Sequence, residues 1–137
     1  MQHLDFAYAT SLIRTFMNDP SLVLTIRGRK YTPSLEFNVG KQHIKTQSVQ
    51  TEVDAGYEGK DKIVLIEAKR SGSKNTIIRQ LYYPFRQWQS HTDKKVYTLF
   101  FENDSRSDIY SLWIFEFTDT MDYNSIKLVK SERFKII

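Results

Sequence analysis

The sequence contains no cysteine among its 137 residues. This absence excludes a disulfide scaffold, a thiol nucleophile and a zinc site built on cysteine. The sequence has no run of about 18 apolar residues, so it predicts no membrane-spanning helix and no membrane partner. The first twenty residues carry Asp5, Arg14 and Asp19 and do not resemble a signal peptide. We therefore expect a cytoplasmic protein.

Several catalytic signatures are also missing. There are only five glycines, and none forms the phosphate-binding loop of nucleotide-triphosphate enzymes, so no nucleotide triphosphate is expected. The three histidines (His3, His43 and His91) are scattered and lack metal-ligand spacing. No serine lies in a nucleophile elbow.

The composition that remains is that of one folded domain covering residues 1–137. Hydrophobic residues make up 40% of the chain and aromatic residues 14%, so a disordered chain is not expected. The net charge is +4, from 20 basic and 16 acidic residues. This basic excess permits a polyanionic partner without requiring one.

Hydrophobic periodicity predicts both helices and strands. A helix is expected over 6–17, ended by Asn18-Asp19-Pro20. A second helix is expected from about Thr76, with a kink or a break at Pro84. Residues 55–61 are predicted to form a turn. Strands are predicted at 22–30, 35–39, 43–54, 62–69, 95–101 and 109–117, with a last strand or hairpin at 126–137.

The order of these elements predicts an α/β protein with a mixed sheet and helices on its faces. The strand over 62–69 has an unbroken apolar centre, Ile63-Val64-Leu65-Ile66. Such a run is typical of a central strand that is buried on both faces.

Charged residues end this strand. Glu67 and Lys69 are two apart and therefore share a face. Asp54 ends the preceding extended segment, and a reversal through the glycine turn would lay that segment beside the central strand. Two carboxylates and an ammonium group would then meet at the end of the sheet. Carboxylate oxygens suit Mg²⁺, and a metal with a lysine suits phosphodiester hydrolysis.

The spacing alone carries little information, because Glu-x-Lys occurs twice. The other copy, Glu58-Gly59-Lys60, lies in the predicted turn with no buried strand beside it. The alternative interpretation of Glu67 and Lys69 is an exposed pair at a solvated strand end, which would contribute little stability.

Three segments together resemble the PD-(D/E)xK nuclease superfamily, in particular type II restriction endonucleases. They are Val53-Asp54-Ala55-Gly56-Tyr57, Leu65-Ile66-Glu67-Ala68-Lys69 and Ile78-Arg79-Gln80-Leu81-Tyr82-Tyr83-Pro84. The resemblance implies a restriction-endonuclease-like αβββαβ core, here with extra C-terminal strands. It also implies a Mg²⁺-dependent DNA endonuclease, with Mn²⁺ able to replace Mg²⁺.

The resemblance assigns roles to individual residues. Asp54 and Glu67 would bind Mg²⁺, together with the carbonyl group of Ala68. Lys69 would orient and activate the attacking water, and Gln80 would support the site. The products would carry a 5′ phosphate and a 3′ hydroxyl group.

The chain departs from the superfamily pattern at two points. Val53 stands where the motif has proline. The acidic residue that some members place on the first helix is missing, and Glu52 is a candidate accessory acid in its place. The alternative for Glu52 is a solvent-facing strand residue.

Double-stranded DNA is the expected partner, and a homodimer is the simplest arrangement for cutting both strands. Rival interpretations are a Holliday junction resolvase, a DNA repair nuclease, or a non-catalytic DNA-binding module of the same fold. Candidate phosphate contacts come from Arg27 and Arg29, in the basic segment 27–31 that leads from the first predicted strand to the next, and from Arg70, Lys74 and Arg79.

Overall fold

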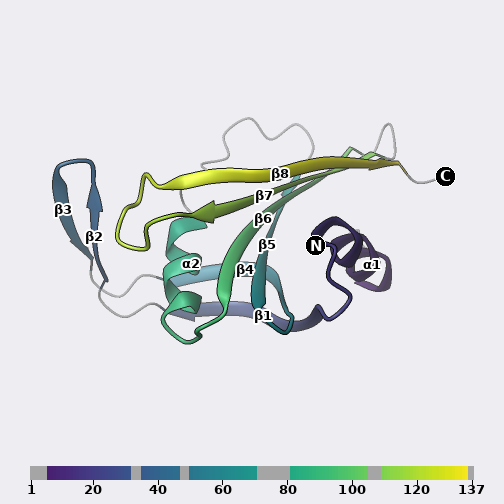
Figure 1. The fold of residues 1–137 in the computed structure, drawn as a ribbon, viewed down its shortest axis with the longest axis horizontal. Coiled ribbons are helices and arrows are strands. Elements are labelled where there is room, and N and C mark those ends of the chain that lie inside the picture. The colour runs from purple at the N-terminus through teal and green to yellow at the C-terminus, as the bar shows by residue number, and fades with distance from the viewer. Residues whose placement is uncertain (1–5, 32–34, 47–49, 71–80, 105–108, 136–137) are drawn as a thin grey trace.

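The computed structural model of the chain describes residues 6–31, 35–46, 50–70, 81–104 and 109–135 (Figure 1). The helices in these ranges are α1 (Phe6–Met17) and α2 (Tyr82–Gln89). Neither of them is long and apolar enough to cross a membrane. The strands are β1 (Val23–Tyr31), β2 (Leu35–Val39), β3 (Gln42–Thr46), β4 (Gln50–Glu58), β5 (Lys62–Arg70), β6 (Lys95–Asp104), β7 (Ile109–Phe117) and β8 (Ile126–Lys135).

Six strands form one mixed sheet in the order β1-β4-β5-β6-β7-β8. The neighbours β1, β4 and β5 are antiparallel, β5 and β6 are parallel, and β6, β7 and β8 are again antiparallel. Parallel neighbours need a crossover connection, and α2 lies in the chain between β5 and β6. The strands β2 and β3 form a separate hairpin between β1 and β4. The predicted mixed α/β sheet is therefore confirmed.

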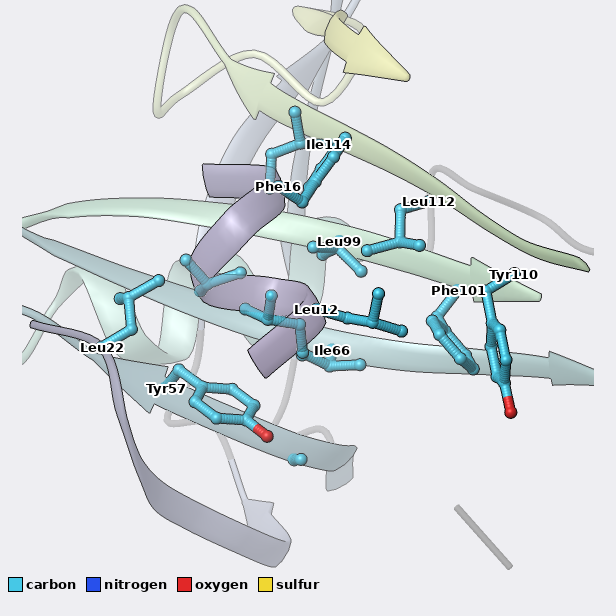
Figure 2. Packing of buried hydrophobic residues seen from close by; sticks show 13 residues of the cluster. Leu12, Phe16, Leu22, Tyr57, Ile66, Leu99, Phe101, Tyr110, Leu112 and Ile114 are labelled. Atoms are coloured by element: carbon cyan, nitrogen blue, oxygen red, sulfur yellow. The ribbon is translucent and has the colours of Figure 1, made fainter. Parts of the chain in front are cut away.

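Helix α1 covers one face of the sheet, called here the α1 face (Figure 2). Its apolar residues include Leu12 and Phe16, which pack in one cluster with buried strand residues such as Tyr57 and Ile66. The helix ends at Met17 as predicted, and Asn18 follows it in the left-handed region with a φ of 52°.

Helix α2 and the hairpin cover part of the opposite face, called here the α2 face. Tyr82 and Phe85 pack with Ile63 and Leu65 of β5, and Phe37 of the hairpin belongs to the same cluster. The rings of Phe37 and Tyr82 lie 5.0 Å apart between centroids, close enough for a specific aromatic contact. The apolar centre of β5 is thus buried from both sides, as its sequence predicts.

The boundaries around β4 differ from the predictions. The segment 55–58 belongs to β4, and only Gly59, Lys60 and Asp61 separate it from β5, so the predicted turn over 55–61 is wrong. Gly56 pairs with Leu65 inside the sheet, because pairing and burial outweigh the usual turn preference of glycine. The predicted strand over 43–54 is instead two strands, since β3 ends at Thr46 with its hairpin partner.

The N-terminal part of the predicted second helix, 76–80, lies outside the described residues. The described helix begins at Tyr82, which places Pro84 in its first turn. The first four N–H groups of a helix have no intrahelical acceptor, so proline there removes no helical hydrogen bond. Within α2, Pro84 therefore does not need the predicted kink or break.

Candidate functional site

The strands β4 and β5 carry the predicted carboxylates. Their antiparallel ladder runs from Glu58↔Ile63 to Ala55↔Ile66. Asp54 and Glu67 are the next residues on the two strands beyond that last pair. The predicted reversal of the chain, which lays the aspartate-bearing segment along the central strand, is therefore confirmed for the backbone.

The side chain of Glu67 continues the α2 face of β5. Ile63 and Leu65 pack on that face, and alternation along a strand assigns positions 67 and 69 to it as well. Glu67 is half-buried, and Ala68 packs against the cluster on the opposite face. Position 67 thus lies where apolar packing gives way to solvent.

The fit of the predicted residues to a divalent cation rests on donor chemistry and strand position. Glu67 supplies carboxylate oxygens at a half-buried strand end, which suits Mg²⁺. The side chains of Asp54 and Lys69 lie outside the described part of the structure, so the meeting of the three groups stays a prediction. Among the described residues, no group of three His, Asp or Glu side chains is arranged to hold a metal ion.

The basic segment over 27–31 is interpreted from the sequence as a connection between strands, but it is the end of the strand predicted over 22–30. Residues 27–31 lie inside β1, because β4 pairs with that strand as far as Tyr31↔Gln50. Arg29 is paired in register with Glu52, the candidate accessory acid. Arg70 is the last residue of β5. The side chains of Arg27, Arg29, Glu52 and Arg70, and the whole of Lys74, Arg79 and Gln80, lie outside the described part of the chain.

The sheet places one further acid beside the predicted site. The parallel ladder pairs Lys69 with Glu102 of β6, so the two residues share a face at about 5 Å between neighbouring strands. Glu102 is half-buried. Sequence reasoning missed it, although a signal was present. Aligning the predicted strands 62–69 and 95–101 at their first residues, as parallel neighbours, would bring Glu102 level with Lys69.

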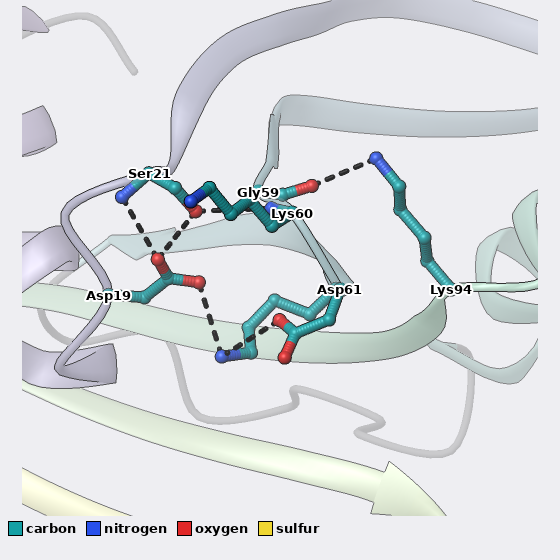
Figure 3. A network of polar contacts seen from close by, with 7 residues as sticks. Asp19, Ser21, Gly59, Lys60, Asp61 and Lys94 are labelled. Atoms are coloured by element: carbon teal, nitrogen blue, oxygen red, sulfur yellow. Dashed lines mark hydrogen bonds and ion pairs between the residues drawn. The ribbon is translucent and has the colours of Figure 1, made fainter.

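The second Glu-x-Lys triplet lies at the other end of the β4–β5 pair (Figure 3). The ammonium group of Lys94 donates to the Glu58 carboxylate at 2.6 Å and to the carbonyl oxygen of Gly59 at 2.9 Å. The backbone N–H of Lys60 donates to Ser21 Oγ at 3.1 Å. This triplet therefore takes part in a structural network. Glu58 ends β4 and pairs with Ile63, so the prediction that the triplet has no buried strand beside it is wrong for Glu58.

Asp19 anchors the same network. Its Oδ1 accepts hydrogen bonds from the hydroxyl group of Ser21 at 2.6 Å and from the Ser21 backbone at 2.9 Å. These bonds, with a smaller contribution from Lys62, hold the pKa of Asp19 below its ordinary value. Burial alone would lower the pKa of Lys62, but Asp19 at 3.2 Å, together with Asp61, raises it. The network fixes the turn between β4 and β5 to the loop after α1.

Comparison with known proteins gives a family and no assigned activity. No curated protein and no solved structure is significantly similar to the chain. A family model covers nearly the whole sequence, from residue 1 to residue 135. The chain belongs to this family, which is described as Domain of unknown function (DUF6997).

Proposed function

We propose that this chain is a Mg²⁺-dependent DNA endonuclease with the PD-(D/E)xK core. The observation that carries the proposal is the order and direction of the elements. One helix is followed by three antiparallel sheet strands (β1, β4 and β5), then by α2 and by β6, which is parallel to β5. This order supports the αβββαβ core that the resemblance implies.

The position of the motif within this arrangement supports the same function. Asp54 lies on the second core strand, and Glu67-Ala68-Lys69 ends the third. The hairpin of β2 and β3 is then an insertion between the first two core strands, and β7 and β8 are the extra C-terminal strands.

The chain's own residues would divide the work of hydrolysis. Asp54, Glu67 and the Ala68 carbonyl group would hold the cation. Lys69 would orient the attacking water in line with the leaving 3′ oxygen, as a charged group beside the carboxylates. When bound, Mg²⁺ supplies a water of lowered pKa and offsets the charge that develops on the phosphate.

A nicking assay with matched variants tests the proposal. Supercoiled plasmid is incubated with Mg²⁺ and the wild type, with Glu67→Gln and with Lys69→Ala. The second Glu-x-Lys triplet supplies the controls, Glu58→Gln and Lys60→Ala. We expect the wild type and both controls to nick the plasmid, and the two site variants to lose activity by about 100-fold or more.

Equal nicking by all five proteins would refute the assigned site, because the activity would then come from another site or a contaminant. Folded wild type that binds DNA but cleaves no substrate with Mg²⁺ or Mn²⁺ would instead identify a non-catalytic DNA-binding module. A four-way junction tested beside linear duplex identifies a junction resolvase if the junction is cleaved preferentially.

A further inference from the structure

Strand β8 forms an edge of the sheet (Figure 1). It also carries most of the net charge of the chain. It holds four basic residues and one acidic residue, a net charge of +3, whereas the whole chain has +4. The side chains over 127–133 and at 135 are exposed. The basic residues are Lys127, Lys130, Arg133 and Lys135.

Only some of these basic side chains form hydrogen bonds or ion pairs within the described part of the chain. Lys130 donates to the carbonyl oxygen of Phe16, at the end of α1, at 2.7 Å. It also lies 3.9 Å from Glu132. Among the described residues, no side chain forms an ion pair with Arg133 or Lys135. These two cations are therefore available to an external anion.

The sheet aligns this pair with the candidate nuclease site. The ladders join Lys69, Glu102, Ser111 and Arg133 in one row across β5, β6, β7 and β8. Residues paired across a sheet share a face, so Arg133 belongs to the α2 face with position 69. Lys135 is two residues further along and belongs to the same face.

The separation along the row matches a short length of DNA. Three inter-strand spacings amount to about 14 Å along the sheet. With one base pair per about 3.4 Å, this distance corresponds to about four base pairs of duplex. A duplex lying over position 69 would therefore present backbone phosphates near Arg133.

We propose that Arg133 and Lys135 form a DNA-binding surface that holds backbone phosphates a few base pairs from the cleaved bond. The proposal rests on the nuclease function for its register with the site. The guanidinium group of Arg133 can bind a phosphate with two parallel hydrogen bonds, and Lys135 adds a point charge. Such contacts position the duplex without reading its sequence. Glu132 pairs with Leu112 and so belongs to the α1 face, away from this surface.

The test measures DNA binding without cleavage. Fluorescence anisotropy of a short labelled duplex is followed in EDTA over a range of salt concentrations, for the wild type and for Arg133→Ala/Lys135→Ala. The matched control is Lys60→Ala/Lys127→Ala. It removes the same charge from exposed residues at the β4–β5 turn and on the α1 face of β8.

The site variant is expected to bind on the order of tenfold more weakly at about 0.1 M salt. Two lost phosphate contacts should reduce the slope of log affinity against log salt by about 1.8. The control should keep the slope of the wild type. Equal losses in the two variants, or no loss in the site variant, would overturn the proposal.

Two further outcomes separate this surface from the proposed nuclease. Plasmid nicking with unchanged binding in the site variant would refute the surface and leave the nuclease standing. Binding that depends on Arg133 and Lys135, without any nicking, would support the surface and refute the nuclease. Vesicles with anionic lipids are tested in parallel. Binding to the vesicles but not to the duplex would assign the strand to a membrane and overturn the proposal.

Discussion

Replacing Gly59 by alanine is expected to destabilise the protein by about 2 kcal/mol. A Cβ atom at this position would lie 2.9 Å from Asp19 Oδ2, 2.9 Å from Ser21 Oγ and 3.0 Å from Leu22 Cδ2. Gly59 is buried, and its N–H donates to the carbonyl oxygen of Lys62 at 2.9 Å. The neighbouring side chains must therefore shift to admit a methyl group.

The magnitude follows from the contacts that would be disturbed. Adding a methyl group to a well-packed site costs about 1–3 kcal/mol, and weakening hydrogen bonds to the Asp19 carboxylate adds to that cost. Replacing glycine also restricts the unfolded chain, which offsets about 0.4–1 kcal/mol. A net loss of about 2 kcal/mol would lower Tm by about 6 °C for a domain of this size.

Urea denaturation of Gly59→Ala, with and without Ser21→Ala, measures this effect. Removing Ser21 Oγ deletes one of the two closest contacts, so the cost of the alanine should fall in that background. A variant as stable as the wild type would refute the reasoning. The reasoning would also be refuted if Gly59→Ala lowered the free energy of unfolding by the same amount in the wild type and in the Ser21→Ala background.

Two other predictions concern charged groups. Asp19→Asn should lower stability at neutral pH. Because the folded pKa of Asp19 is depressed, its contribution is complete above the ordinary value of 3.8 and is lost as pH falls below it. Denaturation at a series of pH values should therefore show the two proteins converging in acid, and a constant gap would contradict this. Glu102→Gln should slow Mg²⁺-dependent nicking by about 10- to 100-fold, because Glu102 lies beside Lys69 in the sheet. The nicking rates of the variant and the wild type are compared at protein concentrations that give the same fraction of bound DNA. A rate within twofold of wild type would exclude Glu102 as a residue that supports the site.

Much of the fold could be predicted because the hydrophobic periodicity of most segments fits either a helix or a strand, but not both. The helix over 6–17 and the strands at 35–39 and 109–117 match the structure residue for residue. The error at 55–61 has a tertiary cause. Tyr57 is fully buried and Gly56 pairs with Leu65, so partners far away in the sequence keep a glycine-containing segment extended.

The candidate site was predictable only in part, because it depends on strand pairing. The apolar run before Glu67 predicts the end of a buried strand. The backbone of that strand, β5, pairs with β4, which carries Asp54, as predicted. Glu102 pairs with Lys69 across the parallel β5–β6 ladder, and Arg133 joins the same row through β7, so both placements depend on strand register. Hydrophobic periodicity in a single strand does not specify that register.

The contact between Lys130 and the end of α1 joins positions 114 residues apart. The same ammonium group lies 4.9 Å from the centre of the Phe16 ring. The carbonyl group of Phe16, in the last turn of the first helix, thus accepts a hydrogen bond from a residue of β8. During synthesis, β8 must emerge from the ribosome before this contact can form. Long-range contacts of this kind slow folding, so the packing of α1 is completed only after β8 has been synthesised.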